Sequence, residues 1–142
     1  MENEKINMND IRYRPYSDVE ERMRGGIEAL CYLSSQTAEK AGWYYDQKTG
    51  ERIERNTGEV LMLMVTELAE GFEAWRRDLM DDKLPHRPGL EVEFADVFLR
   101  IADTAKALGL DLGGATVEKN RYNLVREDHK KEARQQAHGK KC

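Results

Sequence analysis

Two short stretches of the sequence pair carboxylates at a spacing of three residues. Glu67 and Glu70 lie in TELAEGFEAW, and Glu93 and Asp96 lie in EVEFADVF. Side chains three positions apart leave the same face of an α-helix, so the two acids of each pair can reach one point. Four carboxylates directed into one cleft repel each other strongly, and a divalent cation would relieve that repulsion.

The four acids offer only oxygen atoms, which favour a hard cation, Mg²⁺ or alternatively Mn²⁺. A zinc site would need sulfur or imidazole ligands, which are missing at this spacing. A di-iron site in a bundle would need a Glu-x-x-His motif, whereas His86, His129 and His138 are predicted in a loop or near the tail. Acids on helices are often simply solvated, so a plain acidic surface is the competing interpretation.

Apolar residues at helical spacing predict the helices that would position these acids. Ser17 and Glu20 fit a capping box that begins a first helix, and Gly42 is a suitable end for it. The other predicted helices run from Asn56 or Thr57 to about Met80, from about Leu90 to Leu108, and onward from the glycines of DLGG. The expected core stripes are Val60, Leu61, Met64, Leu68 and Phe72 in the second helix and Phe94, Val97, Phe98, Ile101 and Leu108 in the third.

These helices predict an all-α fold, a small four-helix bundle formed by residues 17–130. Residues 1–16 are expected to form an extended arm, and residues 131–142 a flexible polar tail. The segment WYYDQKTGERIER, between the first two helices, suggests a short hairpin or an ordered loop. Cys31 is expected to fill the core, and Cys142 lies in the tail.

The charge and hydropathy of the chain disfavour several classes of partner. The net charge is −4 and the isoelectric point is near 5.5, which disfavours binding to nucleic acid polymers or to anionic membranes. The sequence has no apolar stretch long enough to span a bilayer, and its N-terminus is polar where a secretory signal would be apolar. A cytoplasmic location is therefore expected.

The acidic motifs and their surroundings resemble the MazG-like nucleoside triphosphate pyrophosphohydrolases of the all-α NTP pyrophosphatase superfamily. The signature of that family is Glu-x-x-Glu, a gap, and Glu-x-x-Asp, and this chain has ELAE and EFAD separated by twenty-two residues. EKAGWYYD resembles the family segment that ends the first helix, and EKNRYNLVRE resembles the run of Lys, Asn and Arg after the third. The resemblance covers about residues 18–130.

The resemblance implies a Mg²⁺ site formed by the four acids, with Glu70 as the preferred general base and Glu67 as the alternative. It implies that Lys119, Asn123 and Arg126 face the triphosphate; their spacing puts them on one helical face, which could equally be a solvated basic surface. The remaining candidates are Trp43 for stacking on the base, Gln36 for a base edge, and Asp103 for a second metal site or for orienting Lys119. Structural alternatives stay open for two of them: Trp43 could instead cover the core, and Asp103 could be a buried acid with a structural partner.

The implied reaction is hydrolysis of a (deoxy)nucleoside triphosphate to the monophosphate and pyrophosphate, with a slight preference for dGTP. The resemblance also implies a homodimer or homotetramer with composite sites. Arg100, four residues past Asp96, departs from the family pattern and weakens the transfer of substrate identity. The alternative from a different class is a non-catalytic helical module for oligomerisation or partner binding, in which the acids only solubilise the surface.

Overall fold

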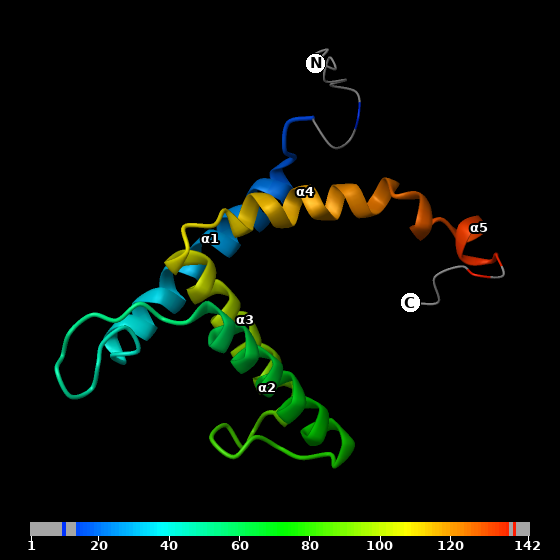
Figure 1. Ribbon diagram of the computed structural model, residues 1–142. Coiled ribbons are helices and arrows are strands. Elements are labelled where there is room, and N and C mark those ends of the chain that lie inside the picture. The colour runs from blue at the N-terminus through cyan, green and yellow to red at the C-terminus, as the bar shows by residue number, and fades with distance from the viewer. Residues whose placement is uncertain (1–9, 11–13, 137, 139–142) are drawn as a thin grey trace. The chain divides into compact units, whose positions relative to one another are not determined.

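The chain is all-α. The computed structural model describes residues 10, 14–136 and 138, and within them the backbone pairs as strands do only at isolated bridges, Tyr45 with Arg52 and Met80 with Pro88. The helices of this part of the chain are α1 Asp18–Lys40, α2 Thr57–Arg76, α3 Gly89–Ala107, α4 Leu112–Val125 and the single turn α5 Lys131–Arg134, with a 3₁₀ turn, η1, at Glu127–His129 (Figure 1).

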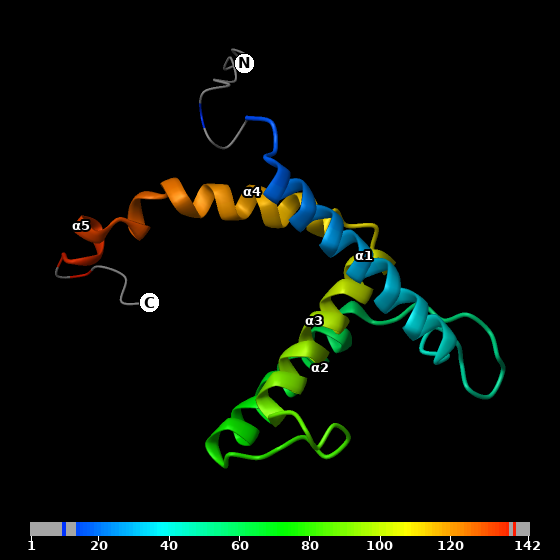
Figure 2. The ribbon, with the colours of Figure 1, turned by 180° about the vertical axis from the view of Figure 1, so that it is seen from behind.

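Contacts divide the chain into two units, Met1–Gly26 with Asp111–Cys142, and Ile27–Leu110. The second unit contains the end of α1 and the pair α2 and α3, which lie side by side in both views (Figures 1 and 2). The predicted bundle of four helices in one domain, residues 17–130, and its assembly into a dimer or tetramer stay predictions.

The same type of C-terminal cap ends α1, α2 and α3. The backbone N–H two residues past each C-cap bonds a carbonyl five residues back: Trp43 to Ala38, Leu79 to Ala74 and Leu110 to Ala105. This Schellman geometry needs a left-handed residue just before that N–H, which Gly42 and Gly109 supply at φ of 80° and 67°. Both glycines were predicted as helix ends.

The second helix ends earlier than its sequence suggests. The predicted end near Met80 is wrong, because Asp78 adopts the left-handed conformation at φ 51° and closes α2 at Arg76. Aspartate tolerates this conformation better than most residues but is a weaker stop signal than glycine. At its start, α2 has the predicted Asn56 cap, whose side chain accepts hydrogen bonds from the N–H groups of Gly58 and Glu59.

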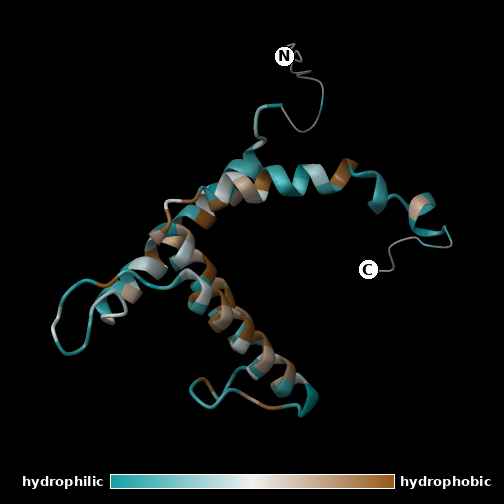
Figure 3. Ribbon diagram, viewed as in Figure 1, coloured by the Kyte–Doolittle hydropathy of each residue, from teal (hydrophilic) through white to brown (hydrophobic). Residues whose placement is uncertain are grey.

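The expected core stripes are largely wrong. Val60 and Met64 are buried, but Leu61, Leu68 and Phe72 of α2 are about half exposed, and on α3 Phe98 is 64% exposed. Several of the buried residues of the two helices are instead small. These are Gly71 and Ala74 of α2 and Ala102 and Ala105 of α3. Figure 3 shows that hydrophobic residues are frequent along both helices.

The first unit joins α4 to the start of α1. Arg121, 1% exposed, donates two hydrogen bonds to Glu20, at 2.8 and 2.9 Å, and others to the carbonyls of Arg14 and Pro15. Glu20 also accepts from Ser17, as the predicted capping box requires, and these bonds hold the pKa of Glu20 well below its usual range. The predicted arm, residues 1–16, lies mostly outside the described residues.

Two sequence expectations near the C-terminus need correction. The glycines of DLGG do not precede the fourth helix; Gly113 and Gly114 lie in the first turn of α4, after the cap Asp111. The reason at Gly113 is steric, since a Cβ there would lie 3.0 Å from the carbonyl oxygen of Arg24. The predicted frayed tail contains the helical turn α5, while residues 137 and 139–142, including Cys142, lie outside the described residues.

Cys31 is buried, as expected, and the segment between α1 and α2 forms an ordered turn. In that turn the Asp46 carboxylate accepts hydrogen bonds from the N–H groups of Lys48 and Thr49, at 2.9 and 2.8 Å. Among the helices of the described residues, none is both long enough and apolar enough to cross a membrane.

We predict that Gly71→Val destabilises the chain by about 1–3 kcal/mol, because a Cβ at Gly71 would lie 3.2 Å from the Cβ of Glu93 and would force α2 and α3 apart. Urea denaturation followed by circular dichroism measures this. The matched control is Gly25→Ala in α1, where a Cβ meets nothing within 4 Å and a gain of about 0.5–1 kcal/mol is expected. Equal stability of Gly71→Val and the natural chain would contradict the close approach.

Candidate functional site

Three of the four predicted carboxylates come together between α2 and α3. One oxygen from each of Glu67, Glu93 and Asp96 lies within 4.8 Å of the other two. Glu67 is 8% exposed, and the other two side chains are half-buried. We call these three residues the acid cluster. Their oxygens are the ligands that Mg²⁺ and Mn²⁺ prefer, so the acid cluster could hold either ion.

The close packing of the helices produces this cluster. Gly71 lets α2 approach α3 at Glu93, and Glu67 lies one turn before Gly71 on the same face of α2. Glu70 is exposed and does not belong to the cluster, although its charge still contributes to the raised pKa of Glu93. The structure thus separates the two acids of the ELAE motif into a buried ligand candidate and an exposed neighbour.

Crowding of the acids changes how they bind protons. Desolvation, a hydrogen bond with Glu67 and the charges of the neighbouring acids raise the pKa of Glu93 to about 7. Desolvation and the charge of Glu67 also raise the pKa of Asp96, while Arg100 acts in the opposite direction. Near neutral pH, the acid cluster without a cation therefore holds a proton on Glu93 for part of the time.

Arg100 is the positive charge that faces the acid cluster. Its Nε donates to Glu67 Oε1 at 2.8 Å, and its side chain is 36% exposed against 10% for that of Glu67. A guanidinium in this position neutralises one carboxylate and occupies an oxygen that a metal ion would need. A cation bound at the acid cluster must therefore share Glu67 with Arg100 or displace it.

Asp103 lies elsewhere on α3, in a buried hydrogen-bond network. Its Oδ1 accepts from the Tyr44 hydroxyl, and its Oδ2 accepts from Arg55 Nη1 at 2.9 Å. Asp103 is 7% exposed. Both oxygens are used to tie the segment after α1 to α3, which favours a positioning role over the second metal site or the contact with Lys119 suggested by the sequence.

A cavity of about 410 Å³ adjoins the acid cluster. Asp96 and Arg100 line one side of it, and Trp43, which is 67% exposed, lies at its edge. The rest of the wall is mostly apolar and comes from α1, α2 and α3: Leu33, Ala38, Val60, Leu63 and Leu99. A volume of this size suits a small organic ligand next to the acids.

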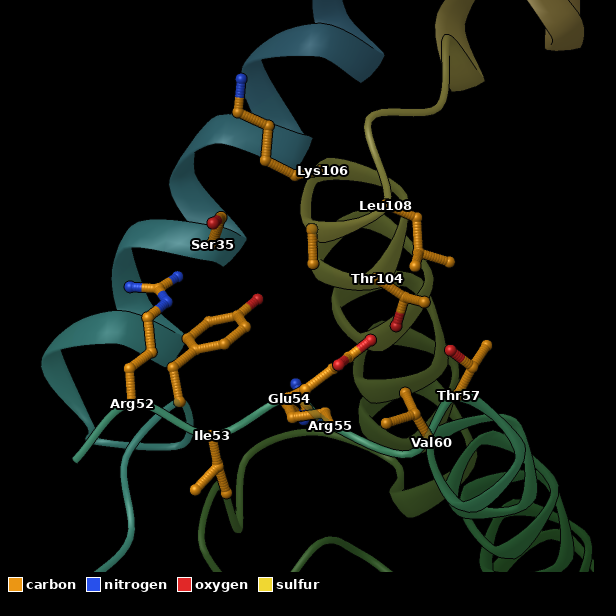
Figure 4. Close-up of a pocket in the computed structure, with 12 residues that line it drawn as sticks. Ser35, Arg52, Ile53, Glu54, Arg55, Thr57, Val60, Thr104, Lys106 and Leu108 are labelled. Carbon is orange, nitrogen blue, oxygen red and sulfur yellow. The ribbon is translucent and has the colours of Figure 1, made fainter. Parts of the chain in front are cut away.

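A larger cavity, about 620 Å³, lies between the end of α1, residues 52–57 and the end of α3 (Figure 4). Arg52, Arg55 and Lys106 bring positive charge to its wall, but Arg52 pairs with Glu39 and Arg55 with Asp103. None of the acid cluster lines this cavity. The smaller cavity is therefore the better candidate to act together with the acids.

Gln36 does not lie in the cavity beside the acid cluster. Its amide donates to the Tyr32 hydroxyl at 2.6 Å, and both residues line a separate depression of about 270 Å³. Trp43 and Gln36 were both predicted to contact a base, but they line different cavities in this chain.

The predicted phosphate-binding residues lie on or next to α4, in the first unit, whereas the acid cluster is in the second. Lys119 and Arg126 both lie near the ring of Tyr122, at 4.9 and 5.7 Å from its centre, which agrees with their predicted common face. Arg126 also forms two hydrogen bonds with Asp128, and the buried Oδ1 of Asn123 has no partner among the described atoms. Their role at a triphosphate stays a prediction.

Three residues near the candidate site were not predicted from the sequence to belong to it: Arg100, Arg55 and Tyr44. For Arg100 a signal existed, since it follows Asp96 by four residues and therefore lies on the same face of α3. Arg55 and Tyr44 reach Asp103 from 48 and 59 residues away in the chain, a pairing that no local spacing reveals.

Comparison of the chain with models of known protein families, with curated proteins and with solved structures finds no match.

The raised pKa of Glu93 predicts that, without divalent cations, the free energy of unfolding falls as the pH rises from about 4.5 to about 7. In this range the folded chain keeps a proton that the unfolded chain has released, so each rise in pH favours unfolding. Urea denaturation in EDTA at several pH values measures the slope.

Glu93→Gln should flatten this slope, and Glu91→Gln, which removes an exposed acid of the same helix paired with Arg87, should leave it unchanged. A Glu93→Gln variant with the same pH dependence as the natural chain would contradict the proton sharing.

We predict that Arg100→Gln lowers the stability of the metal-free chain and increases the stabilisation that Mg²⁺ provides. Loss of the half-exposed ion pair with Glu67 should lower the metal-free stability by about 1 kcal/mol. The rise in melting temperature on adding Mg²⁺ should then be larger than in the natural chain, because the ion no longer competes with a guanidinium. Thermal denaturation with a Mg²⁺ titration measures both effects.

Arg87→Gln, which removes an exposed ion pair with Glu91, is the control. An unchanged or smaller rise in melting temperature with Mg²⁺ in Arg100→Gln would contradict the competition between the ion and the guanidinium.

Proposed function

We propose that the chain hydrolyses (deoxy)nucleoside triphosphates to the monophosphate and pyrophosphate, using Mg²⁺ or Mn²⁺ held by the acid cluster. One observation carries the proposal: Glu67, Glu93 and Asp96 converge, and Asp96 also lines the neighbouring cavity. A nucleotide has the matching pair of features, a polyanion that needs a cation and a flat, largely apolar base that suits a cavity.

Different residues would hold the cation and accept the proton. Glu67, Glu93 and Asp96 would hold the cation, which when bound supplies neutralisation of the phosphate charge and a more acidic water. The exposed Glu70, next to the acid cluster but outside it, would accept the proton of the attacking water. The water oxygen would bond to the α-phosphorus while the bond to the bridging oxygen breaks and pyrophosphate leaves.

The resemblance stated above adds binding groups for the triphosphate: Lys119, Asn123 and Arg126. In a homodimer or homotetramer these residues could come from a second copy, as composite sites in the resembling family imply. An assembly would also cover apolar side chains that are exposed on α2 and α3, among them Leu68, Phe72 and Phe98. The proposal keeps the cytoplasmic location and the slight preference for dGTP inferred from the sequence.

A non-catalytic helical module is the second candidate, and two observations favour it. The exposed apolar side chains of α2 and α3 suit a partner helix, and Arg100 already neutralises Glu67 without a metal ion. In this case the acid cluster would be a structural ion-pair site, and neither Mg²⁺ nor nucleotides would bind.

The test is a panel of dGTP, dATP, dCTP, dTTP and dUTP with Mg²⁺, with phosphate measured with and without added inorganic pyrophosphatase. We expect phosphate only when that coupling enzyme is present, and loss of the signal in Glu93→Gln and Asp96→Asn. Glu70→Gln should lower kcat by about 10²- to 10⁴-fold, as loss of a general base does, while the stabilisation by Mg²⁺ persists.

Glu73→Gln, which removes an exposed acid paired with Arg76 on the same helix, is the matched control and should stay active. Phosphate released without the coupling enzyme would indicate a phosphatase instead. No phosphate from any nucleotide would refute the proposed function.

A further inference from the structure

The wall of the cavity beside the acid cluster contains a buried hydroxyl without a partner. Ser34 is 6% exposed, lines this cavity, and its Oγ has no hydrogen-bond partner among the described atoms. Leaving a buried polar group unpaired is unfavourable, so such a group in a folded chain calls for a ligand or a bound water.

Ser34 lacks the backbone hydrogen bond that several threonines in the helices form. Hydroxyl residues inside helices commonly bond the carbonyl four residues earlier, and Thr37, Thr104 and Thr116 all do so, at 3.0, 2.7 and 2.7 Å. Ser34 lies one turn before Thr37 on α1 but forms no such bond. The Ser34 hydroxyl is therefore a buried, unpartnered group in the wall of this cavity.

Other polar side chains on the same wall are already engaged. Arg55 bonds Asp103, Arg100 bonds Glu67, and the Thr37 hydroxyl bonds its own helix. Asp96 belongs to the acid cluster. A ligand that fills the cavity thus meets apolar side chains, the exposed ring of Trp43, the charged side chains of Asp96 and Arg100 on one side, and one hydroxyl without a partner.

We infer that this cavity takes the base of the nucleotide and that the Ser34 hydroxyl is a specificity-determining contact to the polar edge of that base. The inference rests on the proposed function, since Asp96 connects the cavity to the acids that would face the phosphates. A base is flat, can stack on Trp43, and carries hydrogen-bonding atoms only at its rim, which matches a wall with one available hydroxyl.

The experiment uses deoxynucleosides without phosphate and without divalent cations, so that it does not depend on catalysis. In full-length Trp75→Phe protein, Trp43 is the remaining tryptophan, and its fluorescence is titrated with deoxyguanosine, deoxyadenosine, deoxycytidine and thymidine. We expect a saturable change with at least one nucleoside. Adding Ser34→Ala should raise the dissociation constant of the preferred nucleoside by about three- to tenfold, which is the effect of losing one hydrogen bond. The differences in affinity among the four nucleosides should become smaller.

Ser35→Ala is the matched control, because Ser35 lines the larger cavity instead, and its affinities should equal those of the parent. Ser34→Ala is expected to fold normally, since it removes an unpaired polar group, and circular dichroism checks this. Absence of saturable binding by any nucleoside, or affinities in Ser34→Ala equal to those of the parent, would overturn the inference.

The result separates the two proposals. Pyrophosphate release that depends on Glu93 without any effect of Ser34 would leave the hydrolase proposal intact and refute the base pocket. Nucleoside binding that depends on Ser34 without pyrophosphate release would support the pocket and refute the hydrolase.

Discussion

Repulsion among Glu67, Glu93 and Asp96 is the constraint on which the rest of the second unit depends. The three acids are held within 4.8 Å of one another in a place that water only partly reaches. The chain without a cation relieves this repulsion in two ways, a proton retained on Glu93 and the guanidinium of Arg100 on Glu67. A divalent cation would neutralise three carboxylates more fully than this proton and guanidinium do, and it is the ion that our proposal places there.

The packing of α2 on α3 enforces this proximity. Gly71 of α2 lies against Glu93 of α3, and Gly89 of α3 lies against Ala74 of α2, so the backbones approach closely. Several larger apolar side chains of both helices remain exposed. The same approach leaves a cavity next to Asp96, closed on its other side by the end of α1 and by the network around Asp103. The acid cluster and the cavity therefore share α2 and α3, and α1 completes the wall of the cavity.

Local signals in the sequence predicted much of the framework. The capping box at Ser17, the cap at Asn56 and the stop at Gly109 are confirmed because each depends on a few neighbouring residues. The buried faces of α2 and α3 were predicted only in part: Val60 and Met64 are buried, but periodicity also selected large apolar residues such as Phe98 that are exposed. Apolar periodicity alone does not distinguish a face that packs inside the chain from one that stays on its surface.

The candidate site, like the framework, could be predicted from the sequence only in part. The three-residue spacing indicated that acids would converge, but the rotation of α2 that buries Glu67 and exposes Glu70 depends on the close contact at Gly71. The spacing of Ser34 three residues after Cys31 places it on the same face of α1, but the sequence does not show that its usual backbone bond is missing. The most direct test is a crystal structure grown with Mn²⁺, with anomalous scattering recorded at the manganese edge. We predict a peak bonded by the acid cluster, with Arg100 withdrawn from Glu67; a saturated crystal with the Arg100–Glu67 bond intact and no manganese at these acids would contradict the account.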